Sequence, residues 1–256
     1  MYSLIETKEM MVEIGRKLYE KEYIVASEGN LSTRLDQWRV LTTPAGMCKG
    51  QLRAEDLVIT DLEGKRVEGK NKPSSELLMH LVVYRERPNV FGVVHAHPRT
   101  CTGFAVAGIP LDPALMAEVV VTLGCVPLAE YGTPSTEELA DAVGKYIREY
   151  DALLLSNHGA ITVGKDLLSA YYKMETLEHY AQINLIARTL GRVQPISTEN
   201  VEKLVALREK YGVEGPSVQC PVSHGGSCPA GGPETVTMTR SQLAGLIEDA
   251  VRTITG

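Results

Sequence analysis

Val93-Val94-His95-Ala96-His97-Pro98 is an apolar run that ends in two histidines separated by a single residue. The run predicts a buried strand over residues 90–96. Because alternate side chains of a strand point to the same face, His95 and His97 are expected to project toward one point. Two imidazoles held in this way form half of a metal site, and neutral imidazole nitrogen suits zinc.

Two further candidate ligands lie elsewhere in the chain. His158 follows the apolar run 152–155, and Glu76 ends the sequence Pro73-Ser74-Ser75-Glu76. Three histidines and one carboxylate are typical of a catalytic zinc centre, in which one position can open for a substrate. The alternative is that H-x-H arises by chance in a strand whose rings are simply hydrogen-bonded. The remaining histidines are expected to be packed or solvated rather than ligating: His80, His179 and His224.

Hydrophobic periodicity predicts helices and strands that follow one another along most of the chain. The expected helices cover residues 6–22, 75–85, 136–149, 166–190 and 198–211. The expected strands cover residues 38–42, 57–60, 90–96, 152–155 and 160–163, with a tight turn at 62–65. Ser74 or Ser75 is the predicted cap of the second helix, and a capping signal at 135–138 precedes the third. Such a mixture indicates an α/β protein, a sheet covered by helices.

Composition narrows the class of protein. The 256 residues carry a net charge of −6 without a basic run, which argues against nucleic acid as a partner. No apolar stretch is long enough to span a membrane, and the first residues do not read as a secretory signal. The five cysteines are odd in number and show no C-x-x-C spacing, which favours reduced thiols and a cytoplasmic location.

The composition changes abruptly after Tyr211. We expect a catalytic domain over residues 1–212, a flexible Gly/Pro-rich linker over 213–236 and an amphipathic docking helix over 237–256. The charges of that helix are balanced, which disfavours an anionic membrane and favours a protein partner. The alternative is that the helix folds back on its own domain. Metal binding by Cys220, His224 and Cys228 within the linker is not expected.

Five short motifs, in this order and spacing, place the chain in a family. They are Gly29-Asn30-Leu31-Ser32, Thr43-Pro44-Ala45-Gly46, Ser74-Ser75-Glu76, His95-Ala96-His97 and Asn157-His158-Gly159. Over residues from about 5 to 212 the chain resembles the class II aldolase and adducin-head superfamily, especially the L-fuculose-1-phosphate aldolases. The resemblance implies a three-layer α/β/α fold with a largely antiparallel central sheet. It also implies a homotetramer whose active sites lie at subunit interfaces.

The resemblance implies roles for individual residues. One Zn²⁺ per subunit would be bound by His95, His97 and His158, with Glu76 beside the metal as the proton-transferring base. Tyr211 matches a tyrosine that a neighbouring subunit supplies as a general acid/base. The substrate phosphate would be held by Gly29, Asn30, Gly46, Ser74 and Ser75. The implied reaction is reversible cleavage of a ketose 1-phosphate, such as L-fuculose 1-phosphate, to dihydroxyacetone phosphate and an aldehyde such as lactaldehyde.

Two positions depart from the aldolase pattern. Ala45 stands where the family usually has threonine, and Leu128 stands near a usual tyrosine, so the phosphate cradle loses a hydroxyl and the aldehyde end loses a ring. Related activities on the same scaffold remain open: sugar-phosphate dehydratase, decarboxylase and 4-epimerase. The epimerases typically have aspartate where Glu76 stands. A non-enzymatic, adducin-like scaffold is disfavoured because that branch has lost the metal ligands, which are all present here.

The C-terminal extension has a resemblance of its own. A Gly/Pro-rich tether that ends in a short amphipathic helix resembles the encapsulation peptides that load enzymes into bacterial microcompartments. This implies a microcompartment shell protein as a partner and the microcompartment interior as a second location.

Overall fold

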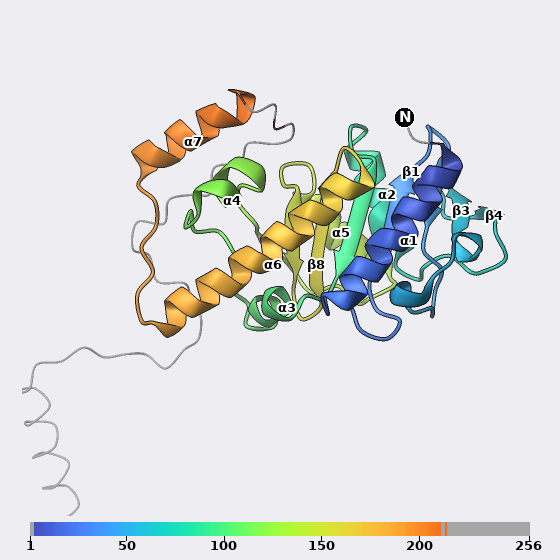
Figure 1. Cartoon of the computed structure of the whole chain (residues 1–256), viewed down its shortest axis with the longest axis horizontal. Helices are drawn as coiled ribbons and strands as arrows, with labels where there is room; N and C mark the ends of the chain where they lie inside the picture. The colour runs from blue at the N-terminus through green and yellow to red at the C-terminus, as the bar shows by residue number, and fades with distance from the viewer. Residues whose placement is uncertain (1–2, 211–212, 214–256) are drawn as a thin grey trace, which may run out of the picture. The chain divides into compact units, whose positions relative to one another are not determined.

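An eight-stranded sheet forms the centre of the computed structural model, which describes residues 3–210 and 213 (Figure 1). The strands are β1 (Asn30–Arg34), β2 (Arg39–Thr42), β3 (Val58–Asp61), β4 (Arg66–Glu68), β5 (Gly92–Ala96), β6 (Leu128–Ala129), β7 (Ala152–Leu155) and β8 (Gly159–Gly164). Across the sheet their order is β4-β3-β2-β1-β5-β8-β7-β6. Every neighbouring pair is antiparallel except β6 and β7.

Helices cover both faces of this sheet and make a three-layer fold (Figure 1). Strand β5 is an inner strand of the sheet, between β1 and β8. One face packs against α1 (Leu4–Glu20), α3 (Arg99–Val106) and α6 (Leu167–Thr189), and the other against α2 (Leu77–Glu86) and α5 (Glu137–Tyr146). Strand β5 contributes to both cores, because Val94 joins the first and Val93 the second. The predicted α/β/α fold with a largely antiparallel sheet is confirmed.

The remaining helical segments lie outside these two main layers of long helices. Helices α4 (Ala117–Thr122) and α7 (Thr198–Lys210) pack against each other. Two short 3₁₀ turns, η1 (Lys49–Gln51) and η2 (Ala54–Asp56), follow β2 and pack against α1. No helix in the part of the chain that the structure describes is long and apolar enough to cross a membrane.

The helix starts follow local capping chemistry. Helix α1 begins two residues earlier than predicted, because Ser3 is its N-cap and Glu6 closes a capping box by accepting from the Ser3 N–H at 2.7 Å. Thr136 caps α5 and Asp166 caps α6, each with a side-chain oxygen that accepts from the first turn. The predicted turn at 62–65 joins β3 and β4, where Asp61 accepts from the Lys65 N–H at 2.8 Å.

Five of the helices and strands described here were not predicted, namely β1, β4, β6, α3 and α4, and neither were the 3₁₀ turns η1 and η2. Strand β1 is the important omission, because it lies between β2 and β5 and carries the Gly29–Ser32 motif. Its side chains are buried although several are polar, so it shows no apolar run. The Ser32 hydroxyl is 2.7 Å from His80 Nδ1, and the Thr33 hydroxyl donates to the Phe91 carbonyl at 2.7 Å. Internal hydrogen bonds of this kind let polar residues occupy a buried strand.

The domain prediction extends beyond this part of the chain. The chain divides into a first unit, Met1–Ser223, and a second, His224–Gly256. Tyr211, nearly all of the linker predicted at 213–236 and the docking helix predicted at 237–256 lie outside the described residues.

Candidate metal centre

The three predicted histidine ligands lie together at one end of the central strands. His95 is in β5, His97 follows the end of that strand, and His158 lies in the turn between β7 and β8. Strands β5 and β8 pair with Ala96 opposite Ala160, so the β7–β8 turn lies beside the end of β5. The ring centroids are separated by 4.9 Å (His95–His97), 4.8 Å (His95–His158) and 4.9 Å (His97–His158).

This nearly equilateral triangle brings candidate ligand atoms from all three rings within 4.8 Å of one another. Gly159 permits the arrangement. A Cβ atom at this position would lie 2.5 Å from His97 Cδ2 and 2.6 Å from the Ala96 carbonyl oxygen. Asn157 adopts a left-handed backbone with φ of 55°, which asparagine tolerates better than most residues. The Asn157-His158-Gly159 motif therefore has a steric basis.

Hydrogen bonds orient the first two rings. His95 Nδ1 lies 2.9 Å from the Ala160 carbonyl oxygen, and His97 Nδ1 lies 3.0 Å from Glu28 Oε2. Because carbonyl and carboxylate oxygens only accept hydrogen bonds, each Nδ1 carries the proton and each neutral ring presents a lone pair at Nε2. Burial lowers the pKa of His95, and burial together with His158 lowers the pKa of His97, so both rings favour the neutral form.

The Nε2 atoms of His95 and His97, both unprotonated in these tautomers, face each other at 3.1 Å. Two lone pairs cannot form a hydrogen bond at that distance, whereas a cation placed between them would be bound by both nitrogens. His158 adds an Nε2 atom 3.2 Å from Glu76 Oε1, and its buried Nδ1 has no hydrogen-bond partner among the described residues. The donor set fits a divalent cation that accepts imidazole nitrogen.

Glu76 is the carboxylate of this cluster. Its Oε2 atom lies 3.5 Å from His95 Nε2 and accepts a 2.8 Å hydrogen bond from Asn30 Nδ2. Burial opposes ionisation of Glu76, but the hydrogen bonds from His158 and Asn30 outweigh it and hold its pKa well below the usual range. The carboxylate is therefore held ionised.

The predicted N-cap of α2, Ser74 or Ser75, is wrong. Neither Ser74 nor Ser75 is the N-cap of α2, because that position is Glu76 itself, whose side chain makes no capping hydrogen bond. The carboxylate is directed to the histidines and Asn30 instead. Ser74 contributes differently, by accepting a 3.3 Å hydrogen bond from the Glu76 N–H.

The residues predicted to hold phosphate come from three loops. The loop at 43–46 pairs with the loop at 72–75, since Ala45 N–H donates to Lys72 O at 3.0 Å and Ser74 N–H to Thr43 O at 3.1 Å. Gly46 has φ of 69° and open space where a Cβ atom would be, and Ser75 is exposed.

The third loop approaches the metal centre directly. Gly29 has φ of 65°, and a Cβ atom there would lie 2.9 Å from the His95 carbonyl oxygen. Asn30 is directed at Glu76, and its Oδ1 atom is buried without a partner among the described residues. The histidine cluster and these loops are thus adjacent, whereas Tyr211 lies outside the described residues.

Glu28 is the site residue that sequence reasoning missed. It lies 69 positions from His97 in the chain, and no local pattern links the two residues. The one available signal is its place directly before the Gly29–Ser32 motif. Two of the histidines predicted not to be ligands behave as expected, because His80 is packed inside the fold and His179 is exposed, whereas His224 lies outside the described residues.

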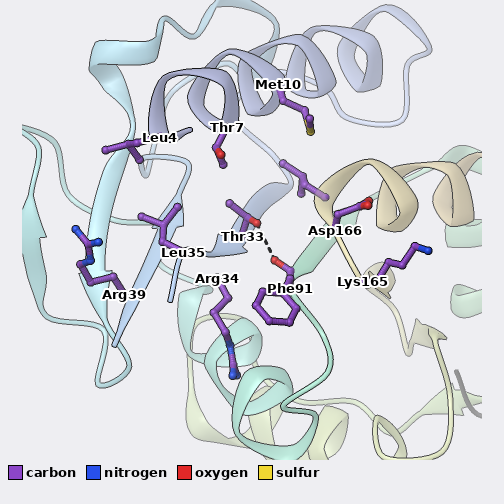
Figure 2. A pocket seen from close by; sticks show the side chains of 11 residues that line it. Leu4, Thr7, Met10, Thr33, Arg34, Leu35, Arg39, Phe91, Lys165 and Asp166 are labelled. Atoms are coloured by element: carbon purple, nitrogen blue, oxygen red, sulfur yellow. Dashed lines mark hydrogen bonds between the residues drawn. The ribbon is translucent and has the colours of Figure 1, made fainter. Parts of the chain in front are cut away.

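A separate pocket of about 540 Å³ lies at the opposite end of β5 from the histidines (Figure 2). Its walls include Leu4 and Met10 of α1, Phe91 just before β5, and Lys165, while Arg34 turns its guanidinium away toward the Tyr84 carbonyl. None of the predicted site residues lines this pocket.

Comparison with a family model agrees with this geometry. Residues 9–185 match the model described as the class II aldolase and adducin N-terminal domain. This range contains all three histidines, Glu76, Glu28 and the three loops.

Individual proteins give the same picture. An L-fuculose phosphate aldolase from Methanococcus maripaludis is 38% identical over 179 residues, which are 70% of this chain and 96% of that protein. A 3-oxo-tetronate 4-phosphate decarboxylase from Haemophilus influenzae is 37% identical over 181 residues, 69% of this chain and 85% of that protein. A solved structure of an L-fuculose 1-phosphate aldolase superposes with a TM-score of 0.75 at 32% identity, covering 81% of this chain and 96% of that one.

Proposed function

The chain belongs to the class II aldolase and adducin N-terminal domain family, and we propose that it is a zinc-dependent aldolase. Its proposed reaction is the reversible cleavage of a ketose 1-phosphate, L-fuculose 1-phosphate or a relative, to dihydroxyacetone phosphate and an aldehyde such as lactaldehyde. The observation that carries the proposal is the convergence of three imidazoles within 4.8 Å beside an ionised carboxylate. An adducin-like scaffold would have no use for such a cluster.

The cation would be held by His95, His97 and His158, with Glu76 at its side. Nitrogen-rich donor sets favour zinc over the hard cations that prefer oxygen, and a three-histidine set leaves a position open. When bound, the cation acts as a Lewis acid for the negative charge that develops on the substrate oxygens.

Glu76 would be the group that removes a proton from the substrate carbon C3 and returns it there. In condensation its ionised carboxylate removes a proton from C3 of dihydroxyacetone phosphate, and C3 then forms a bond to the aldehyde carbon. In cleavage that carbon–carbon bond breaks and Glu76 returns the proton to C3. Tyr211 of a neighbouring subunit would supply and remove the proton on the aldehyde oxygen. The hydrogen bond from Asn30 keeps the Glu76 carboxylate oriented during this exchange.

The phosphate would bind at Gly29, Asn30, Gly46, Ser74 and Ser75. Both glycines adopt left-handed backbone conformations, of the kind found in anion-binding loops. Binding energy from the phosphate would orient C2 and C3 toward Glu76, because this end of the substrate does not react. We propose the homotetramer that the family resemblance implies, and a Tyr211 contributed by a neighbouring subunit requires at least a second copy of the chain.

The deciding experiment measures dihydroxyacetone phosphate release from a panel of ketose 1-phosphates. Zinc-loaded protein should release it from one substrate, and Glu76→Gln should lower kcat by about 10²–10⁴-fold, the usual contribution of a general base. The exposed Glu63 provides a matched control, and Glu63→Gln should retain full activity. Absence of release from folded, metal-loaded protein across the panel would rule out the aldolase.

A second candidate is decarboxylation of a 3-keto acid phosphate on the same site. The Haemophilus influenzae relative named 3-oxo-tetronate 4-phosphate decarboxylase, 37% identical to this chain, supports it. Negative charge develops beside a carbonyl in both reactions, so the same donor set serves either one. Release of CO₂ from 3-oxo-tetronate 4-phosphate, without dihydroxyacetone phosphate release from any ketose, would replace the aldolase with the decarboxylase.

For the C-terminal extension we propose docking to a microcompartment shell protein. The enzyme would then be cytoplasmic and would be taken up into the microcompartment. The support is the Gly/Pro-rich composition after Tyr211 and the apolar stripe in the sequence 237–256. Deleting Val213 onward should leave the aldolase reaction intact and abolish co-purification with shell protein. Unchanged co-purification would contradict this role.

A further inference from the structure

Lys49 is a buried lysine that the proposed reaction does not yet use. It belongs to η1, three residues after Gly46, and only 3% of its surface is exposed. Its ammonium donates a hydrogen bond to the Ser27 carbonyl oxygen. An ammonium has three hydrogens to donate, and no second acceptor for it is found among the described residues.

This lysine is also without an ion pair. Among the described residues no carboxylate lies within 4.0 Å of its ammonium, although Arg87, which is similarly buried, pairs with Asp151 at 2.9 Å. Burial lowers the pKa of Lys49, while Cys48, Glu76 and Glu28 act to raise it. Lysine is rarely buried without a partner, because taking a charge out of water is costly. A neutral donor would be enough to satisfy the Ser27 carbonyl. The hydrogen bond therefore does not explain why a side chain that can carry a positive charge is buried at position 49.

The position of Lys49 supplies that explanation. Its backbone continues from the 43–46 loop, and its hydrogen-bond acceptor, Ser27, immediately precedes Glu28 and Gly29. The side chain therefore links two of the three loops of the candidate phosphate cradle. In the loop that precedes Lys49, Gly46 has open space where a Cβ atom would be, and Ala45 lacks the hydroxyl that the family usually places there.

We propose that Lys49 is a binding residue for the substrate phosphate, supplying a positive charge to a cradle otherwise made of backbone N–H groups and hydroxyls. This rests on the proposed sugar-phosphate function of the same site. The dianion would give Lys49 the ion pair that it does not make with any described residue, and the lysine charge would take the place of the hydroxyl missing at Ala45. Selection for phosphorylated over unphosphorylated sugars would follow from that charge.

The test is calorimetric titration of zinc-loaded protein with inorganic phosphate. Removing the charge by Lys49→Gln or Lys49→Met should raise the dissociation constant by about 10- to 100-fold, as expected for loss of one charge-assisted hydrogen bond. Methionine matches the length and apolar surroundings of the buried side chain, and therefore provides a second variant should glutamine prevent folding. Lys49→Arg keeps the charge and should bind more tightly than either. The exposed Lys65 is the control, and Lys65→Gln should bind as the wild type does.

Zinc content separates binding from mere support of the fold. If Lys49 only tethered the loop that carries Glu28, both charge-removing variants would lose zinc together with phosphate, which would overturn the proposal. Wild-type affinity for phosphate in zinc-loaded Lys49→Gln or Lys49→Met would overturn it as well, without touching the aldolase. If the wild type binds neither phosphate nor dihydroxyacetone phosphate, the proposed function fails, and the role of Lys49 fails with it.

Discussion

The Nε2 atoms of His95 and His97 face each other at 3.1 Å, while the Nδ1 atom of each ring is held by an oxygen. This relationship leaves two lone pairs directed at one point in a largely buried place. The arrangement therefore suits a cation that both nitrogens would bind.

Removal of metal should lower thermal stability. Zinc at about 100 times its dissociation constant should raise Tm by about 5–10 °C over chelator-treated protein, because it binds the folded state alone. Magnesium, which prefers oxygen ligands, should have little effect. Scanning calorimetry gives the shift, and it should disappear in His97→Ala. Equal stabilisation of wild type and His97→Ala by zinc would place the metal elsewhere.

Glu28→Gln should weaken the metal centre. The carboxylate accepts from His97 Nδ1 at 3.0 Å and so fixes the tautomer of the ring and increases its basicity as a ligand. An amide can still accept but carries no charge, so zinc affinity should fall by about 10- to 100-fold. Competition with a chromophoric chelator measures this, with Glu63→Gln as the control. Unchanged zinc affinity would show that the Glu28 contact has no effect on the ligand.

Gly159→Ala should displace His97. The added Cβ atom would lie 2.5 Å from His97 Cδ2, so the ring or the strand must move. We expect a loss of about 1–3 kcal/mol in the free energy of unfolding, together with reduced zinc content. Gly103 in α3 is the matched control, because nothing lies within 4 Å of a Cβ atom there. Gly103→Ala should keep its zinc and gain about 0.5–1 kcal/mol. Equal behaviour of the two variants would contradict the steric argument.

His80 should make the fold sensitive to acid. Burial lowers the pKa of His80 to about 4, whereas an unfolded chain titrates near the ordinary value of 6.5. The unfolded state therefore binds a proton first. Stability from neutral His80 is complete above pH 6.5 and is lost as the pH falls toward 4, by at most about 3 kcal/mol.

Urea unfolding at several pH values would measure that loss. His80→Asn keeps a polar group near the Ser32 hydroxyl, which is 2.7 Å from His80 Nδ1, but cannot take up the proton. Its free energy of unfolding should fall less steeply below pH 6.5 than that of the wild type. Parallel curves for the two proteins would mean that other groups account for the acid sensitivity.

Much of the fold was predictable because it depends on local patterns. The apolar run of β7 was predicted at its observed bounds, and the long periodic segments that became α1 and α6 were located to within two residues. Strand β1 was not predictable, because Asn30, Ser32 and Thr33 are buried by hydrogen bonds to distant partners rather than by apolar character.

The candidate site divides in the same way. The spacing of His95 and His97 follows from the two-residue period of a strand, and the motifs around Glu76 and His158 are continuous in the chain. The sequence by itself therefore determined the fold family and the ligand types. Only the tertiary structure placed Glu28 on His97, Asn30 on Glu76 and the Lys49 ammonium on the Ser27 carbonyl. Those contacts join residues 22 to 69 positions apart, and their distances depend on how strands and loops pack, for which no local periodicity exists.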